Sequence, residues 1–103
     1  VNLAFNYSSK SEIIESLKKL IKQKNKITVN SIKNYLYTKD TPDPEVLIRT
    51  GGQKRLSDFL LWQMSYTEIF FLRKLWPDFN KSDFKKILEE YQKIKRNFGG
   101  IDD

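Results

Sequence analysis

The residues best suited to chemistry lie between positions 46 and 71, in the stretch VLIRTGGQKRLSDFLLWQMSYTEIFF. Arg49 and Arg55 stand on either side of a Gly-Gly pair, and Ser57 follows two residues later. Two guanidinium groups, a hydroxyl and nearby backbone N–H groups suit a diphosphate, whose oxygens accept paired hydrogen bonds. The pattern therefore indicates an anion site of the phosphate type.

A second interpretation of these arginines stays open at this point. Both could pair with carboxylates such as Asp58 or Glu68, because structural ion pairs are common in proteins. The spacing of the residues does not decide between an anion site and a set of structural salt bridges.

The composition limits the other kinds of chemistry. The chain has 103 residues, 39% of them hydrophobic, which is enough for one small domain with a core. It contains no cysteine and no histidine, which excludes disulfides, thiolate metal sites, cysteine nucleophiles and the usual general base at neutral pH. Any reaction must use Asp, Glu, Lys, Arg, Tyr, Ser or a metal ion.

The net charge of +6 raises the question of nucleic acid. Most of the 19 basic residues are lysines spread along predicted helix faces, a pattern typical of solvated surfaces. We therefore expect no nucleic-acid partner, keep a basic nucleic-acid-binding module as an alternative, and leave open a weak attraction to anionic lipid surfaces. No apolar run approaches the length of a membrane span and no signal peptide is recognisable, so we expect a soluble, cytoplasmic protein, with peripheral contact at the inner face of the membrane left open.

The elements that position these residues alternate between strands and helices. Residues 1–7 predict a strand buried on both faces, and Ser9 and Glu12 are spaced as a capping box for a following helix. Its expected inner face consists of Ile13, Ile14, Leu17, Leu20 and Ile21. Thr28 is predicted to cap a shorter helix whose inner face holds Val29, Ile32, Tyr35 and Leu36.

The second half of the chain continues the alternation. Residues 38–45 predict a loop, 46–50 and 68–71 predict strands, and 55–66 predict a helical segment. A last helix should begin after Asn80 as N-cap with Asp83 at its third position, and should end at Gly99-Gly100. Its predicted inner face contains Phe84, Ile87, Leu88, Tyr91 and Ile94. This alternation predicts an α/β fold with a mostly parallel sheet and flanking helices.

The expected strand at residues 1–7 bears on the domain organisation. A strand buried on both faces needs a neighbour and a cover, and no residue that could supply them precedes it in the sequence. We therefore expect residues 1–103 to be the C-terminal part of a single larger domain whose N-terminal half is absent. Because ligands of open parallel sheets bind beyond the carboxyl ends of the strands, Arg49 should reach that edge.

The stretch PDPEVLIRTGGQKRLSDFLLWQMSYTEIFF, followed by LWPDF and preceded by NLAFNYSSKSEI, resembles the C-terminal half of the cis-prenyltransferases, most of all the bacterial undecaprenyl diphosphate synthases. The resemblance implies condensation of isopentenyl diphosphate onto an allylic diphosphate, such as farnesyl diphosphate, to give a long-chain polyprenyl diphosphate for cell wall biogenesis. It also implies Mg²⁺ and a homodimer. Arg49, Arg55 and Ser57 would bind isopentenyl diphosphate, and Glu68 would help to hold Mg²⁺.

The chain departs from the family pattern at several positions. Gln53 replaces a usual glutamate, Lys54 replaces a frequent histidine, and Asn97 stands where an arginine is expected, with Arg96 one step away. The family's first motif, which contains the metal-binding aspartate, is missing, so the isolated segment is expected to be inactive and its catalytic residues stay unknown. A non-catalytic partner subunit would also lack that motif, although such partners tend to lose the substrate arginines that this chain retains.

Two structural roles remain as alternatives to the functional ones that the resemblance implies. Glu68 could be a buried partner of Arg73 or Lys74 in place of a metal ligand. The aromatic side chains could line a prenyl-chain wall, but packing in a core or subunit interface is the favoured interpretation. That group consists of Phe59, Trp62, Tyr66, Phe70 and Phe71.

Overall fold

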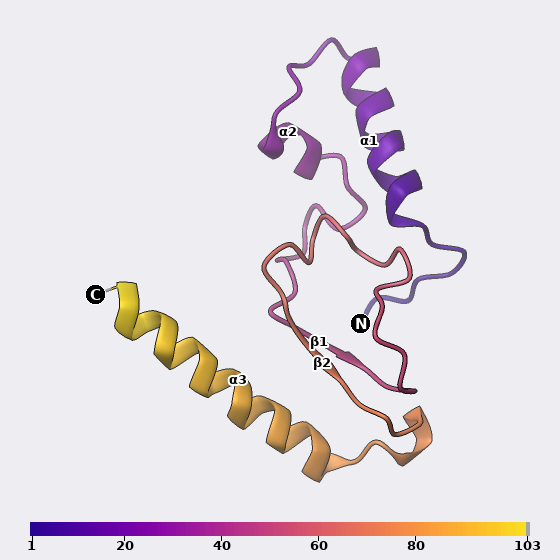
Figure 1. Ribbon diagram of the computed structural model, residues 1–103. Helices are drawn as coiled ribbons and strands as arrows, with labels where there is room; N and C mark the ends of the chain where they lie inside the picture. The colour runs from indigo at the N-terminus through magenta and orange to yellow at the C-terminus, as the bar shows by residue number, and fades with distance from the viewer. Residues whose placement is uncertain (103) are drawn as a thin grey trace. The chain divides into compact units, whose positions relative to one another are not determined.

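The computed structural model describes residues 1–102, and the side chains of residues 1–95 (Figure 1). The chain divides into two compact units. The first contains Val1–Pro44 and Leu56–Tyr66, and the second contains Glu45–Arg55 and Thr67–Asp103. No helix within the described residues combines the length and the apolar character that a membrane crossing requires.

The first unit is built on helix α1, Ser9–Lys22. The N-cap is Ser8, whose Oγ accepts a hydrogen bond from Ser11 N at 3.3 Å. The predicted cap at Ser9 is therefore wrong by one residue. Ser9 is instead fully buried, and its Oγ accepts the N–H of Leu61 at 2.9 Å. Because Ser8 is the N-cap, the helix begins one residue earlier than predicted, and the Ser9 hydroxyl is free to bind the backbone of Leu61.

The buried face of α1 is more polar than the sequence pattern predicts. It consists of Ser9, Glu12, Ser16 and Leu20. Two residues of the predicted apolar face are exposed, Ile14 at 51% and Ile21 at 65%. Helical periodicity identified the helix correctly, but the face that packs is rotated toward the serines and the glutamate because these side chains find hydrogen-bond partners inside the unit.

Helix α2, Val29–Lys33, begins as predicted. Thr28 is its N-cap, and a reciprocal pair of hydrogen bonds with Ser31 forms a capping box. Ile32 and Leu36 are buried with Leu20 in a small core, against which Leu17, Tyr35 and Trp62 pack. The predicted loop at 38–45 contains no helix and no strand.

The second unit contains strands β1, Val46–Arg49, and β2, Glu68–Phe71. They lie side by side and parallel, with Val46 opposite Glu68 and Arg49 opposite Phe71 (Figure 1). This pair confirms both predicted strands and the α/β, parallel character of the fold. A short 3₁₀ helix, η1, Trp76–Asp78, follows β2.

Helix α3, Lys81–Asp102, begins after Asn80 as predicted. Asn80 Oδ1 accepts the N–H of Asp83 at 3.0 Å, and Asp83 Oδ2 accepts the N–H of Asn80 at 3.2 Å. The predicted end at Gly99-Gly100 is wrong, because the helix continues through both residues. Glycine lowers helix propensity by about 1 kcal/mol but keeps its backbone N–H, so it weakens a helix without breaking the hydrogen-bond pattern.

The predicted strand at residues 1–7 is not formed. Val1, Leu3 and Phe5 are 79% exposed or more, and the segment belongs to the first unit, whereas β1 and β2 belong to the second. A strand exists only where a neighbour accepts its backbone hydrogen bonds. Among the described residues, none provides such a neighbour for this segment.

The predicted helical segment at 55–66 is also absent. This stretch consists of turns, and Ser57, Asp58 and Leu60 have φ values of +51°, +61° and +47°. These left-handed conformations cannot belong to a right-handed helix. The hydrophobic spacing of LSDFLLWQM therefore reflects side chains that turn inward from a compact loop.

Candidate functional site

The Gly-Gly turn that follows β1 is fixed by backbone hydrogen bonds. Arg49 O accepts the N–H of Leu72 at 2.8 Å, Gly52 N donates to Leu72 O at 3.0 Å, and Gly51 N donates to Lys74 O at 2.8 Å. The φ values of +94° at Gly51 and +80° at Gly52 strongly favour glycine. The expectation that backbone N–H groups of this turn serve a ligand is wrong for these two, because both already donate to carbonyl groups.

The two predicted substrate arginines form no salt bridge among the described side chains of the second unit. Among the described side chains, the single salt bridge joins Lys74 to Asp83 at 3.0 Å. Arg49 is half-buried, and Arg55 is exposed. Within the second unit, no salt bridge joins either arginine to Glu68 among the described side chains, and pairing with Asp58, which belongs to the first unit, stays an open alternative.

Asp58, one of the carboxylates proposed as a partner, has a different role. Its Oδ2 accepts the hydroxyl of Ser8 at 2.5 Å, and its Oδ1 accepts the N–H of Lys10 at 3.1 Å. Its backbone carbonyl accepts the N–H of Ser9 at 2.9 Å. A carboxylate in this position accepts hydrogen bonds from N–H groups that have no partner within the helix. Its negative charge also interacts favourably with the positive end of the helix dipole, so Asp58 stabilises the start of α1.

Gln53, a departure from the family pattern, lies beside Arg49. Its Oε1 is 3.4 Å from Arg49 Nη2. A neutral amide orients the guanidinium without neutralising it, whereas a carboxylate at this position would form an ion pair. The chain therefore keeps the full positive charge of Arg49. The side chains of Arg96 and Asn97, the other departure, lie outside the described residues.

Ser57, the third predicted substrate residue, is exposed. It belongs to the first unit, and both arginines belong to the second. The structure brings Arg49 and Arg55 into one compact unit, and the convergence of Ser57 with them stays a prediction.

Glu68 lies apart from Arg49 within the second unit. It is the first residue of β2 and is paired in register with Val46, whereas Arg49 is the last residue of β1 and is paired with Phe71. Side chains alternate between the faces of a sheet, so three steps along β2 place Glu68 on the face opposite that of Arg49 and about 10 Å along the strands. Glu68 and Arg49 therefore do not form one cluster.

The neighbour of Glu68 is Tyr91 of α3. Burial raises the pKa of the Tyr91 hydroxyl, and the charge and hydrogen bond of Glu45 and the charge of Glu68 raise it further. The alternative that Glu68 pairs with Lys74 is wrong, because Lys74 Nζ lies 3.0 Å from both carboxylate oxygens of Asp83. No bond joins Glu68 to Arg73 among the described residues.

The fit of these residues to Mg²⁺ is partial. Mg²⁺ takes oxygen ligands and is usually held by one or two carboxylates together with substrate phosphates. Glu45 and Glu68 each supply a carboxylate, and their backbones are joined by the hydrogen bond from Glu68 N to Glu45 O at 3.1 Å. Within the described part of the chain, no group of three acidic, histidine or cysteine residues could hold a metal. The residues match Mg²⁺ in donor type and do not complete a site by themselves.

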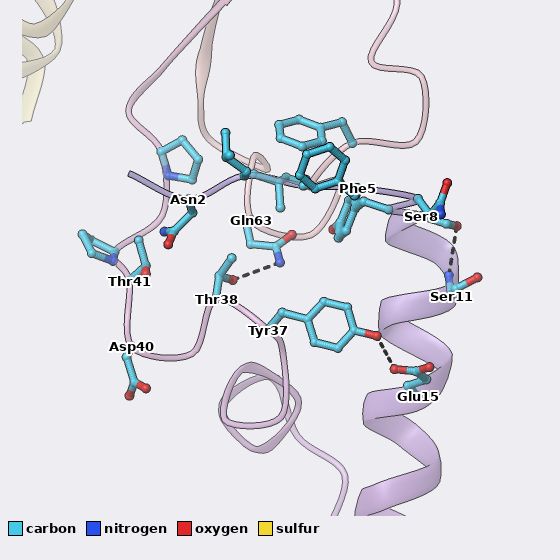
Figure 2. Close-up of a pocket in the computed structure, with 18 residues that line it drawn as sticks. Asn2, Phe5, Ser8, Ser11, Glu15, Tyr37, Thr38, Asp40, Thr41 and Gln63 are labelled. Carbon is cyan, nitrogen blue, oxygen red and sulfur yellow. Dashed lines mark hydrogen bonds between the residues drawn. The ribbon is translucent and has the colours of Figure 1, made fainter.

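The first unit contains a pocket of about 810 Å³, and Figure 2 shows its lining. The lining comes from the segment 2–8, from α1, from the loop 37–44 and from residues 59–63. It includes the carboxylates of Glu15 and Asp40 and no lysine or arginine. A diphosphate requires cationic partners, so this pocket does not fit the anion that the arginine stretch predicts.

A buried hydrogen-bond network in the first unit is centred on Glu12. The carboxylate is 1% exposed and accepts from Tyr7 Oη at 2.5 Å, Tyr37 N at 2.6 Å and Gln63 Nε2 at 3.1 Å. Burial, followed by the bond to Glu12, raises the pKa of Tyr7 to about 12. The predicted capping role of Glu12 is wrong, and its place on the inner face of a helix is the sequence signal for a buried polar network.

The aromatic residues divide between core and surface. Trp62 packs against the core of the first unit, which agrees with the favoured interpretation. Phe59 forms an edge contact with Tyr7 at 5.6 Å between ring centroids. Tyr66 is 98% exposed and Phe71 is 36% exposed. Phe59, Trp62 and Tyr66 belong to the first unit and Phe70 and Phe71 to the second, so a common prenyl-chain wall stays an untested alternative.

Comparisons with known proteins give the same family that the arginine stretch resembles. Residues 1–99 match the family model described as "Putative undecaprenyl diphosphate synthase". The isoprenyl transferase of Thermotoga maritima is 45% identical over 96% of this chain and 45% of its own length. The isoprenyl transferase of Fusobacterium nucleatum is 44% identical over 98% of this chain and 44% of its own length.

Solved structures give the same family. The crystal structure of a probable undecaprenyl diphosphate synthase from Campylobacter jejuni has a TM-score of 0.82 at 39% identity, over 89% of this chain and 43% of that one. Lavandulyl diphosphate synthase from Lavandula x intermedia, in complex with dimethylallyl diphosphate, gives 0.78 at 35% identity, over 86% and 42%. The chain thus spans less than half the length of the proteins it matches. It belongs to the undecaprenyl diphosphate synthase family of prenyltransferases.

Proposed function

We propose that this chain provides the isopentenyl diphosphate side of a cis-prenyltransferase site, as the C-terminal part of a single synthase domain. The observation that carries the proposal is the pair of arginines at the Gly-Gly turn, Arg49 and Arg55, neither of which has a carboxylate partner among the described side chains. Family membership supports it, and so does one structural neighbour, lavandulyl diphosphate synthase, whose structure is a complex with dimethylallyl diphosphate.

The proposed reaction joins isopentenyl diphosphate to an allylic diphosphate such as farnesyl diphosphate. The allylic carbon–oxygen bond breaks, a carbon–carbon bond forms to the isopentenyl unit, that unit loses a proton, and diphosphate leaves. Repetition gives a long-chain polyprenyl diphosphate. Arg49 and Arg55 would grip the diphosphate of the isopentenyl unit by two-pronged hydrogen bonds, and Ser57 would add a hydroxyl donor.

A rigid backbone supports these roles. The hydrogen bonds between the Gly-Gly turn and residues 72–74 hold the base of Arg49, and Gln53 orients its guanidinium without cancelling its charge. Preorganised cations stabilise a charged ligand without a reorganisation cost when the ligand binds. This arrangement favours the diphosphate interpretation over a flexible basic surface.

The experiment replaces Arg49 and Arg55 with alanine in the full-length synthase that contains this segment. Each substitution removes charge-assisted hydrogen bonds of about 1.5 to 3 kcal/mol, so the KM for isopentenyl diphosphate should rise about ten- to a hundredfold. Affinity for the allylic diphosphate should change little. Arg49→Lys should restore only part of the affinity, because an ammonium group cannot make the two-pronged contact.

Thermal melting of each variant provides the control. A lowered melting temperature with an unchanged KM would contradict the proposal and assign the arginines a structural role. Equal loss of affinity for DNA in a salt-dependent assay would favour the nucleic-acid alternative. A full-length protein that binds both substrates but lacks turnover would favour the non-catalytic partner subunit.

Mg²⁺ is part of the proposal, with Glu68 as one ligand. The ion would neutralise diphosphate charge, and its oxygen preference suits a carboxylate that shares the ion with substrate phosphates. Glu68→Gln should raise the Mg²⁺ concentration needed for half-maximal activity. The same variant should lower the pKa of Tyr91 whether or not Glu68 binds Mg²⁺, because the charge of Glu68 raises that pKa, so an altered Tyr91 titration with an unchanged Mg²⁺ requirement would assign Glu68 a structural role alone.

We also infer a homodimer, located in the cytoplasm and in contact with the inner face of the membrane. Apolar side chains of the second unit support an association surface: Phe71, Leu75, Trp76, Phe84 and Leu88 are 36% to 69% exposed. The lysine-rich composition supports attraction to anionic lipid. Sedimentation velocity of the full-length synthase, and its binding to vesicles with and without anionic lipid, test these two inferences.

A further inference from the structure

Arg73 follows the strand opposite Arg49, yet its backbone lies against the Gly-Gly turn. The residues on either side of it are bonded to that turn: Leu72 exchanges hydrogen bonds with Arg49 and Gly52 at 2.8 and 3.0 Å, and Lys74 O accepts Gly51 N at 2.8 Å. A β-carbon added to Gly52 would stand 4.0 Å from the Arg73 Cα. The parallel pairing therefore places the backbone of Arg73 beside the Gly-Gly turn that lies between Arg49 and Arg55.

The distribution of arginine in the sequence sets this position apart. The basic residues of the chain are lysines except for Arg49, Arg55, Arg73 and Arg96. Three of these four arginines border one turn, in a protein whose usual cation is lysine. Arginine differs from lysine in its rigid fork of donors, which matches the oxygens of phosphate groups.

The neighbouring cation provides a contrast. Lys74 Nζ lies 3.0 Å from both carboxylate oxygens of Asp83, and Asp83 caps the start of α3. Arg73 is exposed, and no carboxylate pairs with it among the side chains of residues 1–95. The two adjacent cations therefore differ: the charge of Lys74 is neutralised by Asp83, whereas the charge of Arg73 can bind a ligand.

We propose that Arg73 is a third diphosphate-binding arginine, which contacts the same isopentenyl diphosphate group as Arg49 and Arg55 and selects for a diphosphate over a single phosphate. This inference rests on the proposed function and adds a residue to it. A diphosphate carries two phosphate groups with oxygens on both, so a third guanidinium finds acceptors that a single phosphate does not offer.

The test compares Arg73→Ala with Lys81→Ala in the full-length synthase. Lys81 is exposed on the same unit at the start of α3, and no backbone hydrogen bond joins it to the turn among the described residues, so its replacement removes an equal charge without touching the turn's backbone contacts. Arg73→Ala should raise the KM for isopentenyl diphosphate and the inhibition constant of inorganic diphosphate about tenfold. Inhibition by inorganic phosphate should change less than threefold, and Lys81→Ala should change neither constant.

The outcomes separate this inference from the function on which it rests. Equal KM values for Arg73→Ala and Lys81→Ala, with a large effect of Arg49→Ala, would overturn the role of Arg73 alone. No effect of Arg49→Ala would overturn the proposed function itself. Arg73→Lys keeps the charge and should fold if alanine does not; full diphosphate affinity in that variant would contradict the requirement for a forked donor.

Discussion

Glu68 and Arg49 lie at opposite ends and on opposite faces of the parallel β1–β2 pair. Each is separated from the other by about 10 Å of strand, so they should act on substrate independently. In the double variant Arg49→Ala, Glu68→Gln, the activation free energy for kcat/KM should rise by the sum of the two single-variant increases, within about 0.5 kcal/mol.

Steady-state kinetics of the four proteins in this cycle, at saturating Mg²⁺, measure the coupling. A coupling energy well above that limit would mean that both residues hold the same diphosphate. That result would contradict the separation seen in the second unit.

Substitution of Gly51 or Gly52 should lower the free energy of unfolding, because both residues have positive φ values. Alanine at Gly52 meets no atom closer than 4.0 Å, so its cost comes from φ of +80° and not from a clash. We expect Gly52→Ala to lower the free energy of unfolding by about 1 to 3 kcal/mol. Gly52→Asn should cost less, since asparagine tolerates the left-handed region. Chemical denaturation, with Thr50→Ala as the control, measures this order.

The start of α3 should depend on Asn80 and Asp83. Asn80→Ala removes the acceptor for Asp83 N and should cost about 1 kcal/mol of stability. The hydrogen bond from Lys74 holds the pKa of Asp83 below its usual 3.8. Because the pKa is lowered in the folded state, the stabilisation is present above pH 3.8 and is lost as the pH falls through the folded value.

Thermal melts of the native protein and Asp83→Asn as a function of pH test this linkage. The difference between their melting temperatures should shrink below pH 3.8. A constant difference across this range would assign the effect of Asp83 to its uncharged hydrogen bonds.

Tyr7 should titrate late because of its place beside Glu12. Its pKa is about 12 against the usual 10.0. A raised pKa means that the protonated hydroxyl favours the folded state, so this stabilisation is complete below pH 10.0 and is lost as the pH rises through about 12. Glu12→Gln should lower the Tyr7 pKa only part of the way, because burial is the larger cause.

Ultraviolet titration of tyrosinate in Glu12→Gln and in Glu15→Gln tests this assignment. Glu15 accepts the hydroxyl of Tyr37, so its variant should shift the titration of Tyr37 and leave Tyr7 unchanged. The same Tyr7 pKa in the native protein and in Glu12→Gln would mean that burial alone raises it.

The sequence by itself determined part of the local structure, namely two helix caps and two strands, and the identity of the anion-binding candidates. The caps at Thr28 and Asn80 were predictable because a short polar side chain there satisfies orphan N–H groups of the next turn. The strands 46–49 and 68–71 were predictable because short apolar runs bounded by turn residues suit a buried parallel pair. Arg49 and Arg55 were identifiable because forked donors near glycines suit phosphate oxygens.

Only the tertiary structure decided which predicted elements form and which residues meet. The strand-like segment 1–7 has no backbone partner, and left-handed residues at 57, 58 and 60 replace a helix that hydrophobic spacing favoured. The register of β1 against β2 separates Glu68 from Arg49 and places Arg73 beside the Gly-Gly turn. Such relations depend on hydrogen bonds between segments more than 20 residues apart, and the pattern within either short strand does not specify its register against the other.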